Sequence, residues 1–144
     1  MTDSRTAPYA ALLLRLFLSF LFMAHLYRKF AVIGFDNWWN GFKKAEYSDF
    51  SLYYTLGVEF AGAFLLALGI YSRYVSLLAL PVMLAIVNHW AWRRGFWFAD
   101  GGIEFPLAWA IMLILQAMLG DGAYAVRVPA LPWDRPARQE PSAA

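Results

Sequence analysis

Two histidines and two glutamates lie within or beside long apolar runs of this sequence. His25 and His89 each precede a pair of basic residues, and Glu59 and Glu104 each lie in a Gly-aliphatic-Glu-Phe tetrapeptide. A lone acid in an apolar run is costly in hydrocarbon, so we expect it to face a protein interior or a wet cavity. Imidazole and carboxylate groups gathered in such a place can relay protons. These four residues are therefore the candidate chemical site.

The composition indicates that a membrane surrounds this site. Of the 144 residues, 61% are hydrophobic and only 15% are charged, which is too apolar for an ordinary soluble domain. The net charge of +2 is too small and too scattered for a nucleic-acid-binding protein. Because the chain has no cysteine, it contains no disulfide, thiol relay, covalently attached c-type haem or cysteine-ligated cluster. Any redox chemistry then requires a bound cofactor or a partner protein.

Four apolar stretches predict helices that cross the membrane in up-down-up-down order. A helix of about 20 apolar residues spans ~30 Å of hydrocarbon. We expect these helices at about 8–30, 52–70, 74–92 and 103–119. The predicted fold is therefore all-α, a transmembrane four-helix bundle formed by residues 1–126. Residues 127–144 are rich in proline and charge and are predicted to be a disordered tail.

The first loop contains a segment of a different kind, residues 35–46. Its aromatic residues share one helical face and its Asp, Asn and Lys residues the other, which is typical of a helix lying in the membrane interface. We interpret it as an interfacial anchor, with a lid over a site below it as the alternative.

Two charged residues of the predicted spans need partners or water. Arg15 is expected either to extend toward the N-terminal membrane surface or to pair with the backbone of a neighbouring helix. Glu59 shares a helical face with Gly62, Ala63 and Leu66, and small residues let membrane helices approach closely. The carboxylate of Glu59 is therefore predicted to point into the bundle.

The two halves of the chain share an order of residue types. Each half contains His, an aromatic residue, two basic residues, Gly, an aliphatic residue, Glu and Phe, in that order. His and Glu are 34 residues apart in the first half and 15 apart in the second, and the surplus is about the length of the interfacial segment. This pattern favours a duplicated helical hairpin with one insertion, although chance similarity between apolar sequences would also produce it.

The alternating helix order places all four candidate residues near one membrane face. At ~1.5 Å rise per residue, each lies within roughly 10 Å of that face. A rim of polar and aromatic side chains surrounds this predicted layer and would contact a ligand: Arg28, Asn88, Trp90 and Arg93. Such a layer suits a quinone headgroup, which needs hydrogen bonds, protons and aromatic walls.

Three other interpretations of the layer stay open. Two His and two carboxylates also suit a transition metal, but the Glu-x-x-His motif of di-iron bundles is missing, so no metal site is predicted. His25 and His89 could instead be the axial ligands of a b-type haem. Finally, Glu59 with Arg28 or His89, and Glu104 with Arg93 or His25, could simply be internal pairs that fix the helix register.

Several short motifs, taken in order, resemble the DoxX family of small four-helix membrane proteins. The resemblance covers about residues 8–126 and is carried by Arg15-Leu16, His25, Lys29, Glu59, Gly62, Gly69, Arg73, His89, Gly101-Gly102-Ile103-Glu104 and Gly120-Asp121-Gly122-Ala123-Tyr124. The family includes, or is similar to, the membrane subunit of a thiosulfate:quinone oxidoreductase, and other members are linked to oxidative-stress complexes. The aromatic-rich first loop departs from many relatives.

The resemblance implies a redox-associated, quinone-linked subunit of a bacterial-type plasma membrane, with both termini in the cytoplasm. It implies contact with the lipid bilayer and with a soluble or membrane redox partner, and it permits a homo-oligomer. The alternative function is a non-catalytic scaffold or assembly factor, which would anchor a soluble partner through residues 35–50 and the 93–101 loop.

Overall fold

The computed structural model describes residues 5–126, 128 and 129, and the regular secondary structure within them is entirely helical. The predicted tail, 127–144, lies outside the described residues except for positions 128 and 129. Besides a six-residue π-helix at Arg28–Ile33 and a short 3₁₀ turn at Phe98–Asp100, the described residues form five α-helices: α1 (Ala7–Tyr27), α2 (Phe35–Lys44), α3 (Asp49–Leu68), α4 (Ser72–Arg94) and α5 (Glu104–Leu119). The all-α prediction is confirmed.

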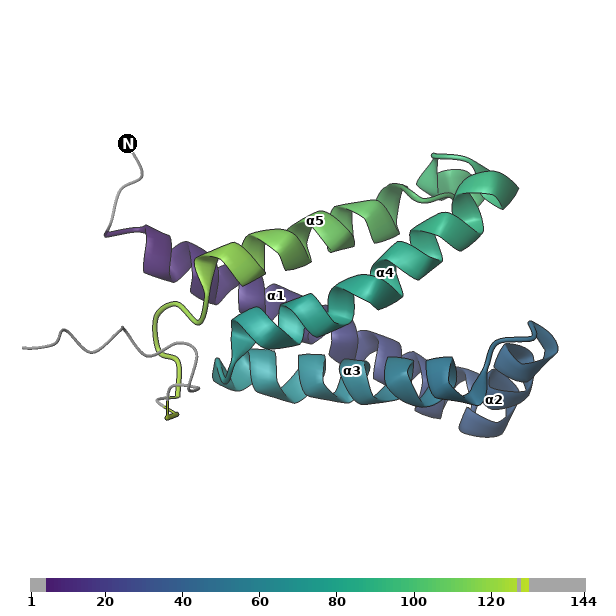
Figure 1. Ribbon diagram of the computed structural model, residues 1–144, viewed down its shortest axis with the longest axis horizontal. Helices are drawn as coiled ribbons and strands as arrows, with labels where there is room; N and C mark the ends of the chain where they lie inside the picture. The colour runs from purple at the N-terminus through teal and green to yellow at the C-terminus, as the bar shows by residue number, and fades with distance from the viewer. Residues whose placement is uncertain (1–4, 127, 130–144) are drawn as a thin grey trace, which may run out of the picture.

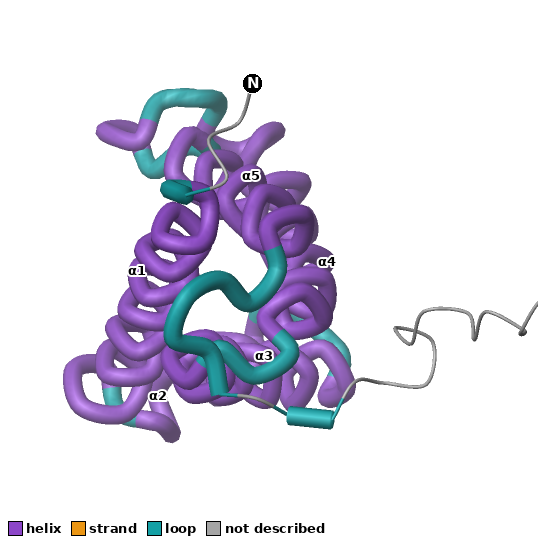
Figure 2. The backbone as a smooth tube through the Cα atoms, turned by 90° about the vertical axis from the view of Figure 1, so that its left-hand side faces the viewer, coloured by secondary structure: helices purple, strands orange, loops and turns teal. Residues whose placement is uncertain are grey.

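Four of these helices lie side by side in alternating directions (Figure 1). α1 packs along α3 and α4 packs along α5, while contacts of α3 with α4 and of α1 with α5 close the ring (Figure 2). The start of α1 and the end of α5 lie at one end, called here the terminal end. The other end, which carries α2 and the 3₁₀ turn, is called the loop end. The arrangement is thus two helical hairpins packed against each other.

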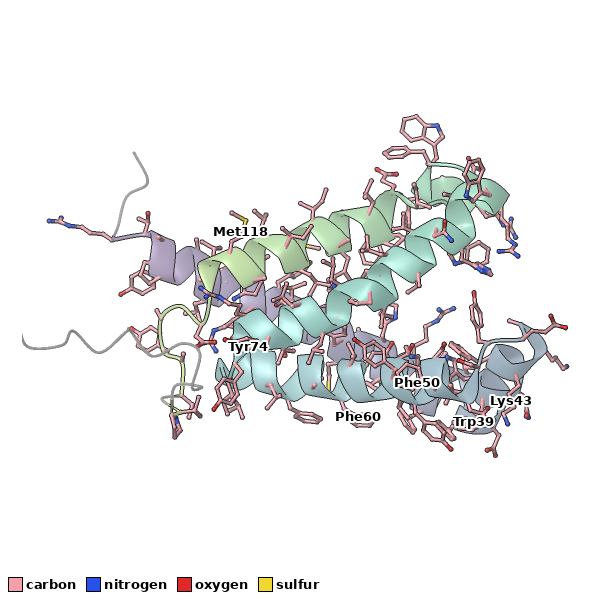
Figure 3. The ribbon with its side chains drawn as sticks, in the orientation of Figure 1. Trp39, Lys43, Phe50, Phe60, Tyr74 and Met118 are labelled. Carbon is pink, nitrogen blue, oxygen red and sulfur yellow. The ribbon has the colours of Figure 1, made fainter. Side chains whose placement is uncertain are left out.

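The helices differ in their capacity to span a bilayer. In the described residues, three helical stretches are long and apolar enough to cross: Ala7–Ile33, Asp49–Leu68 and Ser72–Arg94. α5 is also apolar but has only 16 residues, which span about 24 Å at the usual helical rise. Large apolar side chains, among them Phe60 and Met118, point away from the helices (Figure 3). An outward apolar surface of this kind fits lipid rather than water.

Local sequence signals explain where the helices begin and end. α3 begins at Asp49, three residues before the predicted start, because the side chain of Ser48 accepts a hydrogen bond from the backbone N–H of Ser51 (3.2 Å). α3 ends at Gly69, whose left-handed conformation, with φ of 71°, suits glycine. α1 extends beyond its predicted end because the π-helix continues it to Ile33.

Close approach of α1 and α3 depends on the small residues of α3. A Cβ atom at Gly62 would overlap the aromatic ring of Phe22. Glu59, Gly62, Ala63 and Leu66 are all buried, so the prediction that this face of α3 points inward is confirmed.

Arg15 joins three segments at the terminal end. Its side chain is 1% exposed. Its guanidinium donates to the backbone carbonyls of Leu66 and Ala67 on α3, each at 3.3 Å, and of Ala123 after α5, at 2.8 Å. The interpretation that Arg15 pairs with neighbouring backbone is therefore confirmed. In hydrocarbon, such pairing is what makes a buried cation tolerable.

The segment that follows α5 runs across the terminal end of the helices (Figure 2). The backbone N–H of Ala123 donates to Pro8 (2.9 Å), and that of Val126 donates to Leu68 (3.0 Å). The carboxylate of Asp121 accepts a hydrogen bond from the backbone N–H of Ser72 at the start of α4 (2.7 Å). This segment therefore connects the terminal ends of α1, α3 and α4.

Substitution of Gly69 by alanine tests the importance of this end. The new Cβ would overlap the guanidinium of Arg15 and would force a left-handed backbone on alanine. Strain of that kind costs about 1–3 kcal/mol, so we expect Gly69→Ala to lower the thermal unfolding midpoint in mild detergent. Gly57→Ala is the matched control, because no atom lies within 4 Å of its Cβ position. Equal midpoints for the two variants would contradict this account.

Candidate functional site

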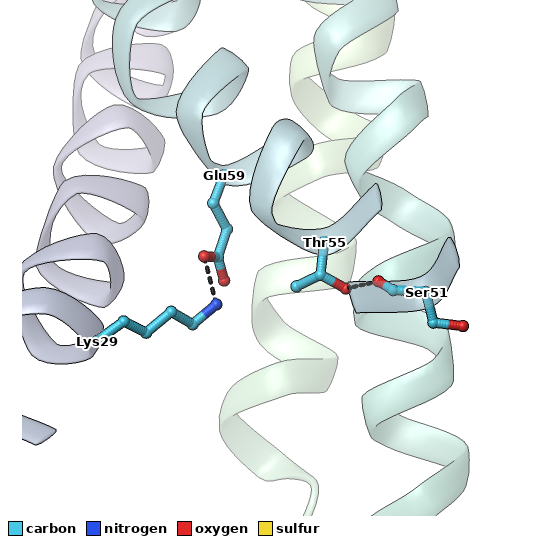
Figure 4. A network of polar contacts seen from close by, with 4 residues as sticks. All are labelled: Lys29, Ser51, Thr55 and Glu59. Carbon is cyan, nitrogen blue, oxygen red and sulfur yellow. Dashed lines mark hydrogen bonds and ion pairs between the residues drawn. The ribbon is translucent and has the colours of Figure 1, made fainter. Parts of the chain in front are cut away.

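A buried ion pair lies near the loop end, between the first hairpin's two long helices. Lys29, in the π-helix, donates a hydrogen bond to Glu59 on α3, and the two side chains point toward each other (Figure 4). Lys29 is 8% exposed and Glu59 is 4% exposed. π-Helical turns are rare and frequently occur at functional sites. A charge pair that is largely shielded from water is costly to keep, which makes this pair the leading site candidate.

An aromatic cluster covers the pair on the side of α2. The ammonium of Lys29 lies 4.3 Å from the ring centroid of Trp38, a cation–π contact. Phe35 stacks on Phe30 and also contacts Trp38 and Trp39. α2 is therefore joined to the end of α1 by ring contacts and leaves the ammonium beneath an aromatic cover.

His89 occupies a second polar position at the loop end. Its Nδ1 atom lies 2.5 Å from the hydroxyl of Tyr47 and 2.9 Å from the guanidinium of Arg93. Arginine can only donate hydrogen bonds, so Nδ1 is the acceptor in its contact with Arg93. The hydrogen bond of Tyr47 joins the linker between α2 and α3 to α4, and it connects the two hairpins at this end.

The other two candidate residues have separate surroundings. Glu104 is exposed, and its carboxylate accepts a hydrogen bond from the backbone N–H of Phe98 (3.0 Å), which holds the loop before α5. His25 is half-buried, and its ring packs edge-on against Trp109, with ring centroids 5.0 Å apart. In the described residues, no hydrogen bond or ion pair joins any two of the four. Their assignment to one ligand-binding layer stays a prediction.

The predicted rim residues also have separate partners. Arg93 contacts His89. The guanidinium of Arg94 lies over Trp90, 5.9 Å from the centroid of the Trp90 ring. Arg28 and Asn88 are exposed. The alternative that Glu59 pairs internally is supported, although its partner is Lys29 rather than Arg28 or His89.

Lys29 was expected only as a basic residue beside the predicted layer, whereas the structure brings it into contact with Glu59. A signal was present, because Lys29 continues the buried stripe of α1 formed by Leu18, Phe22 and Leu26 at helical spacing. Arg28, one position earlier, points to a different side and is exposed. Tyr47 had no such signal, because its contact with His89 joins residues 42 positions apart.

Comparison with known proteins decides the family. The DoxX family model matches residues 10–92, more than half of the chain. The chain belongs to the DoxX family. The match runs from α1 through Trp92 of α4 and includes Lys29, Glu59 and His89 but not Glu104. Neither the curated proteins nor the solved structures yield a match to this chain.

Family membership and the apolar helices together define a multi-pass membrane protein in contact with the lipid bilayer. In the part of this DoxX-family chain that the structure describes, no three His, Asp or Glu side chains lie close enough together to hold a metal ion. The buried ion pair between Lys29 and Glu59 is the candidate site on which the proposal below is based.

A double-mutant cycle tests the energetics of this pair. Lys29→Met alone leaves a buried carboxylate without its partner, and we expect a loss of about 3–5 kcal/mol in the free energy of unfolding. Combining it with Glu59→Leu replaces both charges by apolar groups, and we expect most of that loss to be recovered. The measurement is unfolding by titration with a denaturing detergent. Additive losses in the double variant would show that the two groups are not coupled.

Proposed function

We propose that this DoxX-family protein binds a quinone or a similar lipophilic carbonyl ligand at the loop end, beside Lys29 and Glu59, as the membrane subunit of a redox complex. The observation that carries the proposal is the buried ion pair beneath an aromatic cover. Buried, mutually perturbed charge pairs are concentrated at functional sites.

Both members of the pair have hydrogen-bonding capacity left for a ligand. A lysine ammonium has three N–H donors, and the structure uses one of them on Glu59. The second carboxylate oxygen of Glu59 accepts no hydrogen bond from the described residues. Lys29 would therefore donate to a ligand carbonyl, and Glu59 would hold or release a proton beside it. When bound, a quinone supplies the capacity to accept electrons together with protons.

An apolar groove between α3 and α4 provides space for a lipophilic tail. Its volume is about 220 Å³, and it is lined by Tyr53, Tyr54, Gly57, Val58, Ala61, Val75 and Leu78. The hydroxyl of Tyr54 donates to the carbonyl of Leu78 across this groove (2.7 Å). Val58 lines the groove and precedes Glu59 in α3, so the groove and the ion pair lie at the same level of α3 on faces about 100° apart. A headgroup would reach the ion pair by extending around α3 at this level.

The remaining predicted residues have supporting roles in this proposal. The imidazole of His89, hydrogen-bonded to Tyr47, would pass protons between the ion pair and the loop-end surface, while His25 and Glu104 would extend that route. Arg28, Asn88, Trp90 and Arg93 would line its exit. Electrons would come from a partner protein, since the chain has no cysteine for thiol chemistry. We place the protein in a plasma membrane with cytoplasmic termini, with α5 as a fourth crossing.

The apolar double variant, Lys29→Met with Glu59→Leu, tests ligand binding without a large loss of stability. We expect the wild-type protein in lipid nanodiscs to bind a short-tailed quinone with quenching of tryptophan fluorescence, because Trp38 lies against Lys29. The double variant should bind at least tenfold more weakly, as expected when about 1.4 kcal/mol of polar interaction is lost.

Lys43→Ala is the control for this experiment, since its ion pair with Asp49 is exposed (3.4 Å) and contributes little. We expect Lys43→Ala to retain wild-type affinity. Unchanged affinity in the double variant would refute binding beside the ion pair.

A second function, anchoring of a soluble partner, is favoured by the aromatic residues exposed at the loop end. Trp92 is 90% exposed, and Trp97 and Phe98 are each 65% exposed. Exposed aromatic side chains are characteristic binding anchors, although they also suit the membrane interface.

The two functions respond to different substitutions. If the protein is a scaffold, Trp92→Ala with Trp97→Ala should release a co-purifying partner, whereas the apolar double variant of Lys29 and Glu59 should retain it. Quantitative mass spectrometry of the purified complexes gives the result. Retention of all partners by the tryptophan variant would contradict the scaffold function.

A further inference from the structure

Several fully buried polar atoms on the inner faces of the helices lack hydrogen-bond partners among the described residues. They are Arg15 Nε, Ser72 Oγ, Ser76 Oγ, Trp109 Nε1 and Gln116 Oε1. Each of these side chains is at most 2% exposed. Leaving one such group unsatisfied costs about 1–3 kcal/mol, so a group of five requires an explanation.

Four of the five atoms belong to residues near the terminal end. Ser72 is joined to Asp121 by a hydrogen bond of 2.7 Å, and Arg73 donates to the carbonyl of Ala117 (3.1 Å). α4 and α5 pack against each other in opposite directions, and Ser76 lies one turn after the start of α4 while Gln116 lies about one turn before the end of α5. Both of these side chains are buried on the inner faces of their helices.

Arg15 reaches the same end from α1. Its guanidinium donates to Ala123, two residues beyond the Asp121 carboxylate that caps α4. One turn further along α1, Ser19 donates to the carbonyl of Ala63 (2.6 Å), so polar groups of α1 continue inward as well. Trp109 lies two turns inward of Gln116 on the same face of α5.

The free atoms are chemically complementary to water. The amide N–H₂ of Gln116 is occupied by the carbonyl of Gly120 (2.7 Å), which leaves its oxygen as an acceptor. Arg15 Nε is a donor, and a serine hydroxyl both donates and accepts. A water molecule that receives a hydrogen bond from a hydroxyl or guanidinium and donates to the amide would satisfy these groups together. Buried water usually makes about three such bonds.

We propose that the inner faces of α1, α4 and α5 form a buried water site at the terminal end, in which water bridges Ser72, Ser76, Gln116 and the Nε of Arg15. The site holds water at a depth where the outward faces of the helices are apolar. It lies at the opposite end from Lys29 and Glu59, and it does not depend on the proposed quinone function.

Hydroxyl-radical footprinting by X-ray pulses, with the full chain in lipid nanodiscs, tests this site. Radicals form from water, so buried side chains are oxidised where bound water lies next to them. Leu113 lies between Trp109 and Gln116 on the inner face of α5 and is 0% exposed. Leu52 is the matched control, because it is 1% exposed and lies near the loop end of α3. We expect Leu113 to be oxidised several-fold faster than Leu52.

The wild-type comparison decides the proposal without any variant. Equal background oxidation of Leu113 and Leu52 would show that the region is dry and would overturn it. Ser76→Ala with Gln116→Leu should then reduce the oxidation of Leu113 to the rate of Leu52. A folded double variant in which Leu113 is still oxidised at the wild-type rate would also overturn the proposal, because the named groups would not be holding the water.

Discussion

Hydrocarbon offers no hydrogen bonds, and this constraint explains most of the polar contacts in the protein. A polar group that faces inward from a membrane helix needs a partner within the protein, which is a group of its own helix, a group of another segment or a bound water molecule. Arg15 donates to backbone carbonyls, Lys29 donates to Glu59, and the backbone N–H of Ser72 donates to the carboxylate of Asp121. These contacts join residues far apart in the sequence. The same contacts that satisfy the polar groups therefore also fix the positions of the helices.

The requirement is met differently at the two ends. At the terminal end, the partners are mainly backbone carbonyls and the segment after α5, whose positions are fixed by the helix ends themselves. At the loop end, the partners are side chains with aromatic covers, namely Trp38 over Lys29 and Tyr47 against His89. Side chains change rotamer far more easily than helices change position, so contacts at the loop end are easier to rearrange than those at the terminal end.

The sequence predicts the existence of the helices because long apolar runs act locally, but the prediction missed the capping by Ser48, which starts α3 three residues before the expected position. The sequence predicts the side-chain partners less well, because the rotation of each helix about its axis decides which of two adjacent residues faces a neighbouring helix. Lys29 rather than Arg28 faces Glu59, and one residue corresponds to about 100° around a helix. The two copies of the Gly-aliphatic-Glu-Phe tetrapeptide also have different surroundings. Glu59 lies inside α3 and is buried, whereas Glu104 begins α5 and is exposed.

Burial alone does not identify a functional residue, as the two buried cations Arg15 and Lys29 illustrate. Arg15 is a single cation held by three carbonyl oxygens, and its contacts account for its presence because they connect α1, α3 and the segment after α5. The ion pair connects the π-helix after α1 to α3, and α1 and α3 already pack closely through Gly62 and Phe22; Lys29 also contacts Trp38 of α2. An apolar pair of similar volume would join these helices at least as well. Stability therefore accounts for Arg15, whereas for the ion pair it leaves room for the ligand-binding role that we propose.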